Sequence, residues 1–359
     1  MPEPTYDVLA IGNAIVDVMA RTEEDFLLAE GLSKSTMHLI DAARAEALHG
    51  HMKRAAGIAL PGETLIDARR AEAFRTAIAD PIEKSGGSAG NTAAGVTSLG
   101  GRAAFIGKVA DDPLGQLYRH DMHDSGVYFE TAPLVGGPPT ARSMILITPD
   151  GERTMNTYLG ACHWLGPDDI DEAVVKASAI TYLEGYLWDP PAAKKAFSRA
   201  ASVAHQAGRK VSLTLSDAFC VDRFRAEFLD LIRTGTIDIL FANDSELRSL
   251  YETSSLDAAV ASVAADCALT AVTVGSEGAL VVTSDGVAKI PATPVDTVAD
   301  LTGAGDLFAS GFLFGVARGM DLTKAARLGT IAASEVIGHI GPRPAVSLRD
   351  LANRAGFAL

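Results

Sequence analysis

The sequence DLTGAGDLFASGFLFGVARG, from Asp300 to Gly319, places a glycine-rich turn directly before an almost wholly apolar segment. The apolar run from Asp306 to about Arg318 predicts a buried helix. Residues 303–305, Gly-Ala-Gly, predict a turn whose backbone N–H groups point the same way as the positive end of the helix dipole. Together these features predict an anion-binding site.

Asp306 would lie within reach of any anion held at this turn. A carboxylate beside a bound phosphate is unfavourable for binding alone, because like charges repel. It becomes useful if it orients a hydroxyl group that attacks phosphorus, because phosphoryl transfer needs positioning and charge neutralisation more than a strong base. The helix terminus is expected to lower the pKa of Asp306. The alternative is that Asp306 merely caps the helix, and this segment alone gives both interpretations equal weight.

Short apolar runs recur along the chain and predict strands. They occupy residues 6–11, 102–107, 141–148, 179–185, 210–216, 237–243 and 269–283. Helical patterns lie between many of them, for example at 192–208 and 255–268. This alternation predicts a mostly parallel sheet covered on both faces, with ligands bound beyond the carboxyl ends of its strands.

Residues 15–50 and 128–160 break this rhythm, because they are richer in charge and in short alternating runs. They predict a small, half-exposed sheet standing off the main body. Residues 52–82 predict an extra helical or looped insert. Because no internal repeat or linker divides the chain, residues 1–359 are interpreted as a single domain.

The composition restricts the class of partner. The net charge of −14 disfavours nucleic acid and anionic membrane surfaces. The three cysteines, Cys162, Cys220 and Cys267, are far apart and form no CxxC, which fits a reducing cytoplasm. The start of the chain shows no signal peptide, and the longest apolar runs are far below the roughly 18 residues that a membrane helix needs.

Two further segments carry polar groups beside glycine. In GGSAGNTAAGVTSLGG, residues 86–101, small residues around Asn91 allow close approach of a ligand, although a tight helix entry is slightly favoured from this segment alone. In GNAIVD, a turn after the first strand places Asn13 and Asp17 at the ligand edge of the sheet. Paired polar groups there could bind vicinal hydroxyls, and ordinary turn chemistry is the alternative.

Polar residues also follow later strands. In NDSE, Asn243 to Glu246, the spacing predicts a capping box, and the functional alternative is a pair that holds water-bound Mg²⁺. In DGERTMNTYLG, residues 150–160, DG predicts a hairpin turn, and Arg153 could clamp a phosphoryl group, although a solvated arginine is commoner. GRAAFIGK, residues 101–108, differs from a Walker A loop in its glycine spacing and is interpreted as a strand.

In their kinds and order, these motifs resemble the signatures of the ribokinase-like (PfkB) family of carbohydrate and nucleoside kinases. GGSAGN resembles the amino-terminal signature of the family, and DLTGAGDLFASGF resembles the carboxy-terminal one. NDSE matches its NxxE motif, and TVGSEGALV (273–281) is similar to its nucleotide-side strand and turn. IAASEVIGHIGPRP (331–344) is similar to the segment that follows the catalytic helix. The landmarks span almost the whole chain.

The resemblance implies a doubly wound α/β body with a small β-sheet lid, and transfer of the γ-phosphate of ATP to a substrate hydroxyl. By motif position, Asp306 would be the catalytic base, and Gly303, Ala304 and Gly305 would form the anion hole. The other implied positions are Asn243, Thr273, Gly275, Gly278 and Gly305 for ATP, Glu246 and Asn243 for Mg²⁺, and Asp296 and Ser334 for the K⁺ that this family often holds.

Within the family, GNAIVD and FLLAEGLSKSTMHLI (26–40) most resemble the adenosine kinase branch. Arg153 matches a lid arginine expected to approach the phosphates. Leu301 departs from the family pattern, because it replaces a frequent threonine, and the 52–82 region exceeds that of typical adenosine kinases. These departures bear on the substrate rather than on the reaction. The positions implied for the ribose are Asn13, Asp17, Gly86, Gly87 and Asn91.

Three hypotheses result. The first is an ATP-dependent nucleoside kinase, a monomer or homodimer, that makes AMP from adenosine. In the second, the substrate is a sugar such as ribose, fructose or a keto-deoxy sugar acid. In the third, the chain is a binding protein on an inactive kinase scaffold, which intact Asp306 disfavours. A purine would require apolar or aromatic walls, for which the candidates are Met37, Leu39, Tyr158 and Trp164.

Overall fold

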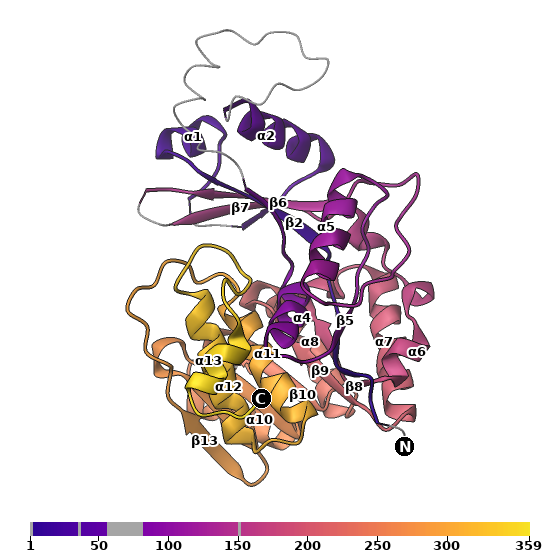
Figure 1. Cartoon of the computed structure of the whole chain (residues 1–359), viewed down its shortest axis with the longest axis vertical. Coiled ribbons are helices and arrows are strands. Elements are labelled where there is room, and N and C mark those ends of the chain that lie inside the picture. Colours follow the sequence, from indigo (N-terminus) through magenta and orange to yellow (C-terminus); the bar gives the residue numbers. More distant parts are fainter. Residues whose placement is uncertain (1–2, 35–36, 56–81, 150–151) are drawn as a thin grey trace.

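Two β-sheets organise the computed structural model, which describes residues 3–34, 37–55, 82–149 and 152–359. The larger sheet forms the centre of an α/β body, and the smaller sheet stands at one end of that body (Figure 1). The predicted α/β class with a second, smaller sheet is therefore confirmed.

The larger sheet contains eight strands in the order β13-β12-β11-β10-β9-β8-β1-β5. Neighbours pair in parallel from β5 to β11, and β12 and β13 pair antiparallel. From β1 the chain goes to β5 on one side and later to β8 on the other, so the strand order reverses at β1. The strands are β1 (Tyr6–Ile11), β5 (Ala103–Ile106), β8 (Ser178–Glu184), β9 (Lys210–Thr214), β10 (Ile239–Asn243), β11 (Leu269–Thr273), β12 (Ala279–Thr283) and β13 (Gly286–Ile290).

Helices cover both faces of this sheet, each over its own buried apolar cluster. One face carries α4 (Ser88–Ser98), α5 (Pro113–Asp124), α11 (Ala304–Ala317), α12 (Leu322–Val336) and α13 (Leu348–Arg354). The other carries α6 (Glu172–Lys176), α7 (Pro191–Gln206), α8 (Ala218–Arg233), α9 (Asp244–Leu250) and α10 (Leu256–Asp266). Because α11 is buried on nearly every side, its sequence is apolar all round, as predicted.

Glycines set the distance between the central helices. A Cβ added at Gly311 of α11 would lie 2.6 Å from the backbone nitrogen of Gly329 in α12. A Cβ at Gly95 of α4 would lie 2.6 Å from the Cβ of Ser310 in α11. The three helices therefore pack closely enough for α4 and α11 to begin side by side.

The smaller sheet has the order β3-β7-β6-β2-β4. Its strands are β2 (Ile15–Arg21), β3 (Met37–Leu39), β4 (Ile82–Ser85), β6 (Ala141–Ile147) and β7 (Arg153–Tyr158). The helices α1 (Glu24–Ala29) and α2 (Ala42–Ala55) cover its outer face (Figure 1). The apolar run 141–148 thus belongs to this sheet, and β4 joins it from outside the two predicted segments. Tyr128, by contrast, bridges to Ala104 of the large sheet.

Most of the predicted insert at 52–82 lies outside the described residues. The described remainder is the end of α2 and the start of β4, which pairs antiparallel with β2. Cys162, Cys220 and Cys267 are free and buried. None of the helices in the described ranges is long and apolar enough to cross a membrane.

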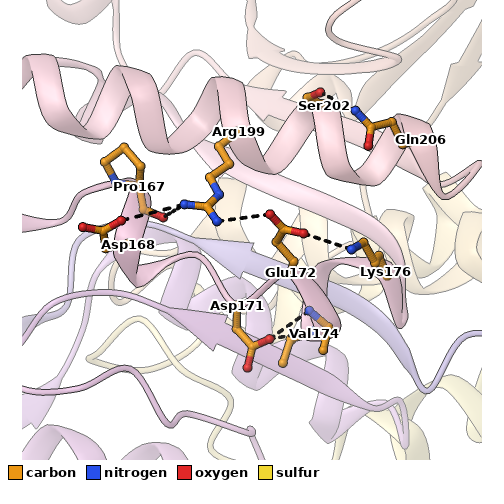
Figure 2. Close-up of polar contacts among 10 residues, drawn as sticks. Pro167, Asp168, Asp171, Glu172, Val174, Lys176, Arg199, Ser202 and Gln206 are labelled. Carbon is orange, nitrogen blue, oxygen red and sulfur yellow. Dashed lines mark hydrogen bonds and ion pairs between the residues drawn. The ribbon is translucent and has the colours of Figure 1, made fainter.

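A polar network on the outer surface joins α7 to α6 and to the turn at Pro167 (Figure 2). Arg199 of α7 donates to the carbonyl oxygen of Pro167 at 3.0 Å and to Glu172 at 3.1 Å. Lys176 donates to the same Glu172 carboxylate at 2.9 Å. Because these side chains are exposed to water, the network contributes little to stability.

The close contact between α11 and α12 predicts that Gly311→Ala destabilises the protein by about 1–3 kcal/mol, despite the better helix propensity of alanine. The added methyl group would meet the Gly329 backbone, which cannot rotate away. Thermal unfolding followed by circular dichroism measures the effect. Gly166→Ala is the matched control, because the nearest atom to its added Cβ is 4.0 Å away. Equal melting temperatures for the two variants would contradict this packing.

Candidate active site

A cleft of about 690 Å³ lies between the carboxyl ends of the large-sheet strands and the inner face of the smaller sheet. It forms where the strand order reverses, the usual ligand position in open α/β sheets. The structure brings most of the sequence-predicted site residues into its lining. These are Asn13, Asp17, Gly87, Asn91, Asn243, Glu246, Thr273, Gly275, Gly303, Ala304, Gly305 and Asp306.

Asp306 lies in the first turn of α11, but it does not cap that helix. The N-cap is Gly303, which has no side chain. The Asp306 carboxylate instead accepts hydrogen bonds from the Ser88 hydroxyl at 2.6 Å and from the Asn91 Nδ2 at 2.9 Å. The capping interpretation is therefore wrong: this carboxylate links α11 to α4.

The expected lowering of the Asp306 pKa is also wrong. Burial raises the pKa of Asp306 above its ordinary value, and the hydrogen bonds from Ser88 and Asn91 only partly oppose this rise. The helix dipole is a weaker influence than the loss of water around the carboxylate. A raised pKa makes Asp306 a better proton acceptor for a hydroxyl group than the sequence indicated.

The turn before Asp306 is open to the cleft. Gly303 has φ +82°, in the left-handed region, and a side chain there would also meet Pro342. A Cβ at Gly305 would meet no atom within 4 Å, so the backbone at this point is accessible to a ligand. Asp300 supports the turn from behind, because its carboxylate accepts from the backbone N–H groups of Thr302 at 2.7 Å and Gly341 at 2.8 Å.

A second helix begins at the same place. The N-cap of α4 is Gly87, with φ +84°, and Ser88 follows as the first helical residue. Since α4 and α11 both start at the cleft, two positive helix ends face it. This pair of termini can stabilise a phosphate group or the charge that develops on one during transfer.

Glu184, at the end of β8, is the central residue that sequence reasoning missed. Its carboxylate is 1% exposed and accepts from Asn13 Nδ2 at 2.7 Å, Asn13 N at 3.3 Å and Ala89 N at 2.9 Å. Burial raises the pKa of Glu184 to about 7. The signal was present in the sequence, since AITYLEG ends a buried strand with a carboxylate at the ligand edge of the sheet.

Asn13 is held by this carboxylate in one orientation. Because an ionised carboxylate only accepts, the Asn13 Nδ2 faces Glu184 and its Oδ1 is left over. That oxygen is buried and has no hydrogen-bond partner among the described residues. Asp17 of β2 lines the same part of the cleft. Gly86 does not line it, but a Cβ there would lie 2.1 Å from Asp17 Oδ2, so a side chain at this position would displace the Asp17 carboxylate.

Asn243 and Glu246 form the predicted capping box at the start of α9. Glu246 N donates to Asn243 Oδ1 at 2.8 Å, and Asn243 N donates to Glu246 Oε2 at 2.9 Å. Asn243 Nδ2 also donates to Glu246 Oε1 at 2.6 Å. Burial raises the pKa of Glu246 to about 7.

The capping box fits a weakly held Mg²⁺. Mg²⁺ commonly uses one or two carboxylates and completes its shell with water and substrate phosphates. Glu246 supplies one carboxylate at the cleft, and Asp217, which also lines the cleft, interacts electrostatically with it. The described residues contain no group of three metal-binding side chains. A single carboxylate at the cleft is compatible with an ion that keeps most of its water ligands.

Other predicted residues lie away from the cleft lining. Gly278, with φ +102°, shapes the turn between β11 and β12. Asp296 is exposed on a bend, and the Ser334 hydroxyl donates to the carbonyl of Ile331 at 2.8 Å, so their K⁺ role stays a prediction. Arg153 begins β7, and its side chain lies outside the described part of the chain, so its phosphate role also stays a prediction.

The cleft also has an apolar wall that the motifs did not predict. Side chains alternate across β2, β6 and β7, so Val18, Met144 and their neighbours face α1 and α2 while the intervening residues face the cleft. Across the cleft, Tyr186 and Phe219 are 37% and 60% exposed. The cleft-facing residues of the smaller sheet and the loop after it are Ile15, Asp17, Leu39, Ser143, Ile145, Met155, Thr157 and Leu159.

Comparison with known proteins places this arrangement among kinases. The sequence profile of the pfkB family carbohydrate kinases matches residues 56–348. The solved adenosine kinase of Sinorhizobium meliloti is 52% identical, with a TM-score of 0.86 over 98% of this chain and 99% of that one. A probable sugar kinase of Rhizobium etli is 48% identical, with a TM-score of 0.87 over the same shares.

A third relative differs in its substrate. The ATP-dependent ribose-1-phosphate kinase of Halopiger xanaduensis is 32% identical over 269 residues, which cover 73% of this chain and 83% of that protein. All three relatives are named as kinases, and their names differ in the acceptor.

Glu184 generates a pH prediction. Burial raises the pKa of Glu184 to about 7, so as the pH falls Glu184 binds a proton at a higher pH in the native state than in the unfolded state. Above pH 7 the carboxylate is ionised and buried, and this lowers the stability of the native state. We expect the free energy of unfolding of the wild type to fall between pH 5 and pH 8 as Glu184 ionises. In Glu184→Gln this part of the fall, about 3 kcal/mol at most, should be absent.

Urea unfolding at several pH values measures this difference. Glu3→Gln is the control, because Glu3 is exposed. Parallel stability curves for wild type and Glu184→Gln would show that Glu184 does not titrate in this range.

Proposed function

The chain belongs to the pfkB family of carbohydrate kinases, and we propose that it transfers the γ-phosphate of ATP to the primary hydroxyl of a nucleoside, converting adenosine to AMP. The observation that carries the nucleoside assignment is the apolar inner face of the smaller sheet. A sugar alone needs hydroxyl-binding groups, whereas a purine needs a flat apolar surface beside them.

The register of the smaller sheet builds this surface. Ser143 pairs with Thr157, and Ile145 pairs with Met155, so their side chains form adjacent rows on one face. The Ser143 and Thr157 hydroxyls lie 2.9 Å apart and bond to each other. Leu39 is 52% exposed and leaves an apolar edge for a base. Phe219 on α8 presents an aromatic ring at the opposite wall.

Of the four residues proposed from the sequence as walls for a purine, one is found in the cleft lining. Leu39 lines the cleft. Tyr158 packs against the cluster under α1 and α2, and Trp164 lies outside the cleft lining. The Met37 side chain lies outside the described residues.

The ribose would lie below the base, at the point where the strand order reverses. The unpartnered Asn13 Oδ1 is a buried acceptor that needs a donor, and a ribose hydroxyl supplies one. The Asp17 carboxylate on the adjoining strand could accept from the neighbouring hydroxyl. This pair suits the vicinal 2′- and 3′-hydroxyls and would direct the 5′-hydroxyl toward Asp306.

In the proposed mechanism, Asp306 orients the 5′-hydroxyl and accepts its proton as the bond to phosphorus forms. The backbone at Gly303, Ala304 and Gly305 would receive the negative charge of the transferring group. Asn243, Thr273 and Gly275 would contact ATP. Mg²⁺ bound with ATP would neutralise phosphate charge, and the Asn243–Glu246 pair could hold it through water.

The substrate is tested by ADP release with Mg-ATP and K⁺ across adenosine, inosine, guanosine, ribose, fructose, keto-deoxygluconate and ribose 1-phosphate. We expect adenosine to give the highest kcat/KM. A sugar-only signal would retain the kinase chemistry and exclude the nucleoside, and turnover of no acceptor despite tight ligand binding would favour the inactive-scaffold hypothesis.

Replacing Asp306 tests the chemistry. Asp306→Asn removes the proton acceptor with little change in size, and we expect kcat to fall by about 10²- to 10⁴-fold. Asp285→Asn, in an exposed turn, is the control. An Asp306→Asn enzyme that turns over at the wild-type rate would refute the assigned role.

Phe219 tests the base position. If the base stacks on this ring, Phe219→Ala should raise the KM for adenosine about tenfold and change kcat less. Trp164→Ala is a closely matched control, because Trp164 is 59% exposed and lies outside the cleft lining. Similar KM values for the two variants would place the base elsewhere.

A further inference from the structure

The loop after α12 returns to the candidate active site and places Arg343 next to Asn91. The loop is fixed on one side by the hydrogen bond from Gly341 N to Asp300, at 2.8 Å. Pro342 packs against Gly303 of the anion-binding turn, because a Cβ at Gly303 would lie 2.6 Å from the Pro342 carbonyl oxygen. Arg343 then extends to Asn91, and its Nε lies 3.4 Å from the Asn91 Oδ1.

The orientation of the Asn91 side-chain amide determines whether its nitrogen or its oxygen contacts the Asp306 carboxylate. Asn91 is 3% exposed, and its two polar atoms face two different charged groups. Its Nδ2 donates to Asp306, and its Oδ1 accepts from Arg343. A rotation of the amide by half a turn would point its oxygen at a carboxylate that only accepts and its NH₂ group at a guanidinium that only donates.

We propose that Arg343 is a positioning residue for phosphoryl transfer: by donating to Asn91 Oδ1, it locks the Asn91 amide so that Nδ2 holds the Asp306 carboxylate toward the substrate hydroxyl. The inference rests on the proposed function, because it assigns Asp306 to that reaction. It explains why a cation from the carboxy-terminal loop is placed among the residues of the amino-terminal signature. Among the predicted ATP and ribose positions that the structure describes, Arg343 donates a hydrogen bond only to Asn91.

The charged surroundings distinguish this role from simple charge compensation. Burial lowers the pKa of the Arg343 guanidinium, and the groups that partly oppose this are Tyr118 and Asp121 of α5 and Asp17 of β2 rather than Asp306. The titratable groups that face Asp306 are Tyr182 and Glu184 of β8 and Tyr186 in the turn after it. Arg343 therefore acts on Asp306 through the Asn91 hydrogen bond.

Arg343→Met tests the proposal, since it keeps the apolar stem and removes every donor. The Asn91 bond lowers the pKa of Asp306, so its loss should move the acid limb of the kcat–pH profile to higher pH. We expect kcat to fall about tenfold or more, with a smaller rise in KM. Arg343→Lys, which retains a donor and the charge, should restore much of kcat and the wild-type acid limb.

Two controls separate positioning from folding. Arg349→Met removes a nearby arginine that binds only the Leu359 carbonyl among the described groups, and it should leave kcat and the pH profile unchanged. In an Asn91→Ala background, Arg343→Met should have no further effect on kcat, because the group it orients is gone. An equal loss in both backgrounds would overturn the proposal, as would a wild-type pH profile in Arg343→Met.

A substrate-free measurement keeps this test independent of the acceptor. The Asp306 carboxyl carbon can be followed by NMR in protein labelled with ¹³C-aspartate and assigned by its absence in Asp306→Asn. We expect it to titrate at higher pH in Arg343→Met than in the wild type. An unchanged titration would refute the role of Arg343 even if adenosine is the substrate. A shifted titration would support it even if another acceptor replaces adenosine.

Discussion

The buried carboxylate of Glu184 holds together the parts of the molecule on which the cleft depends. It ends β8, accepts twice from Asn13 after β1, and accepts once from the first turn of α4. Burying such a group costs free energy, which the three hydrogen bonds repay only in part, so its pKa rises. Gly12 is small because a side chain there would occupy the place of this carboxylate.

The close approach of α4 and α11 is the second constraint. Gly95 lets α4 lie against Leu307 and Ser310, so that two helices from opposite ends of the sequence begin at one point. The bond from Asn91 to Asp306 then joins residues 215 positions apart. The same geometry gives the cleft both its positive helix ends and its carboxylate. Phosphoryl transfer uses both, since positive groups neutralise the charge on the phosphate and a carboxylate can orient the attacking hydroxyl.

The sequence alone predicted those features of the site that depend on local sequence pattern. The polar residues at Asn13, Asn91, Asn243 and Asp306 follow strands or begin helices, so the α/β alternation places them at one edge of the sheet. It could not predict what depends on remote partners. Glu184 belongs to no motif, and Arg343 acquires its contacts only when the last loop folds back. The pKa of Asp306 was predicted in the wrong direction because burial, which depends on the whole fold, outweighs the local dipole.

The position of α11 in the chain has a consequence for biosynthesis. One face of the large sheet is covered by α4, α5, α11, α12 and α13, and the last three begin only at Ala304, after every strand of that sheet. Until they leave the ribosome, Tyr182 and Phe241 on that face have few apolar partners and would stay in contact with water. The nascent chain is thus most exposed to aggregation between the synthesis of β13 and that of α11, and the protein completes this side of its core and gains the Asp306 carboxylate in the same step.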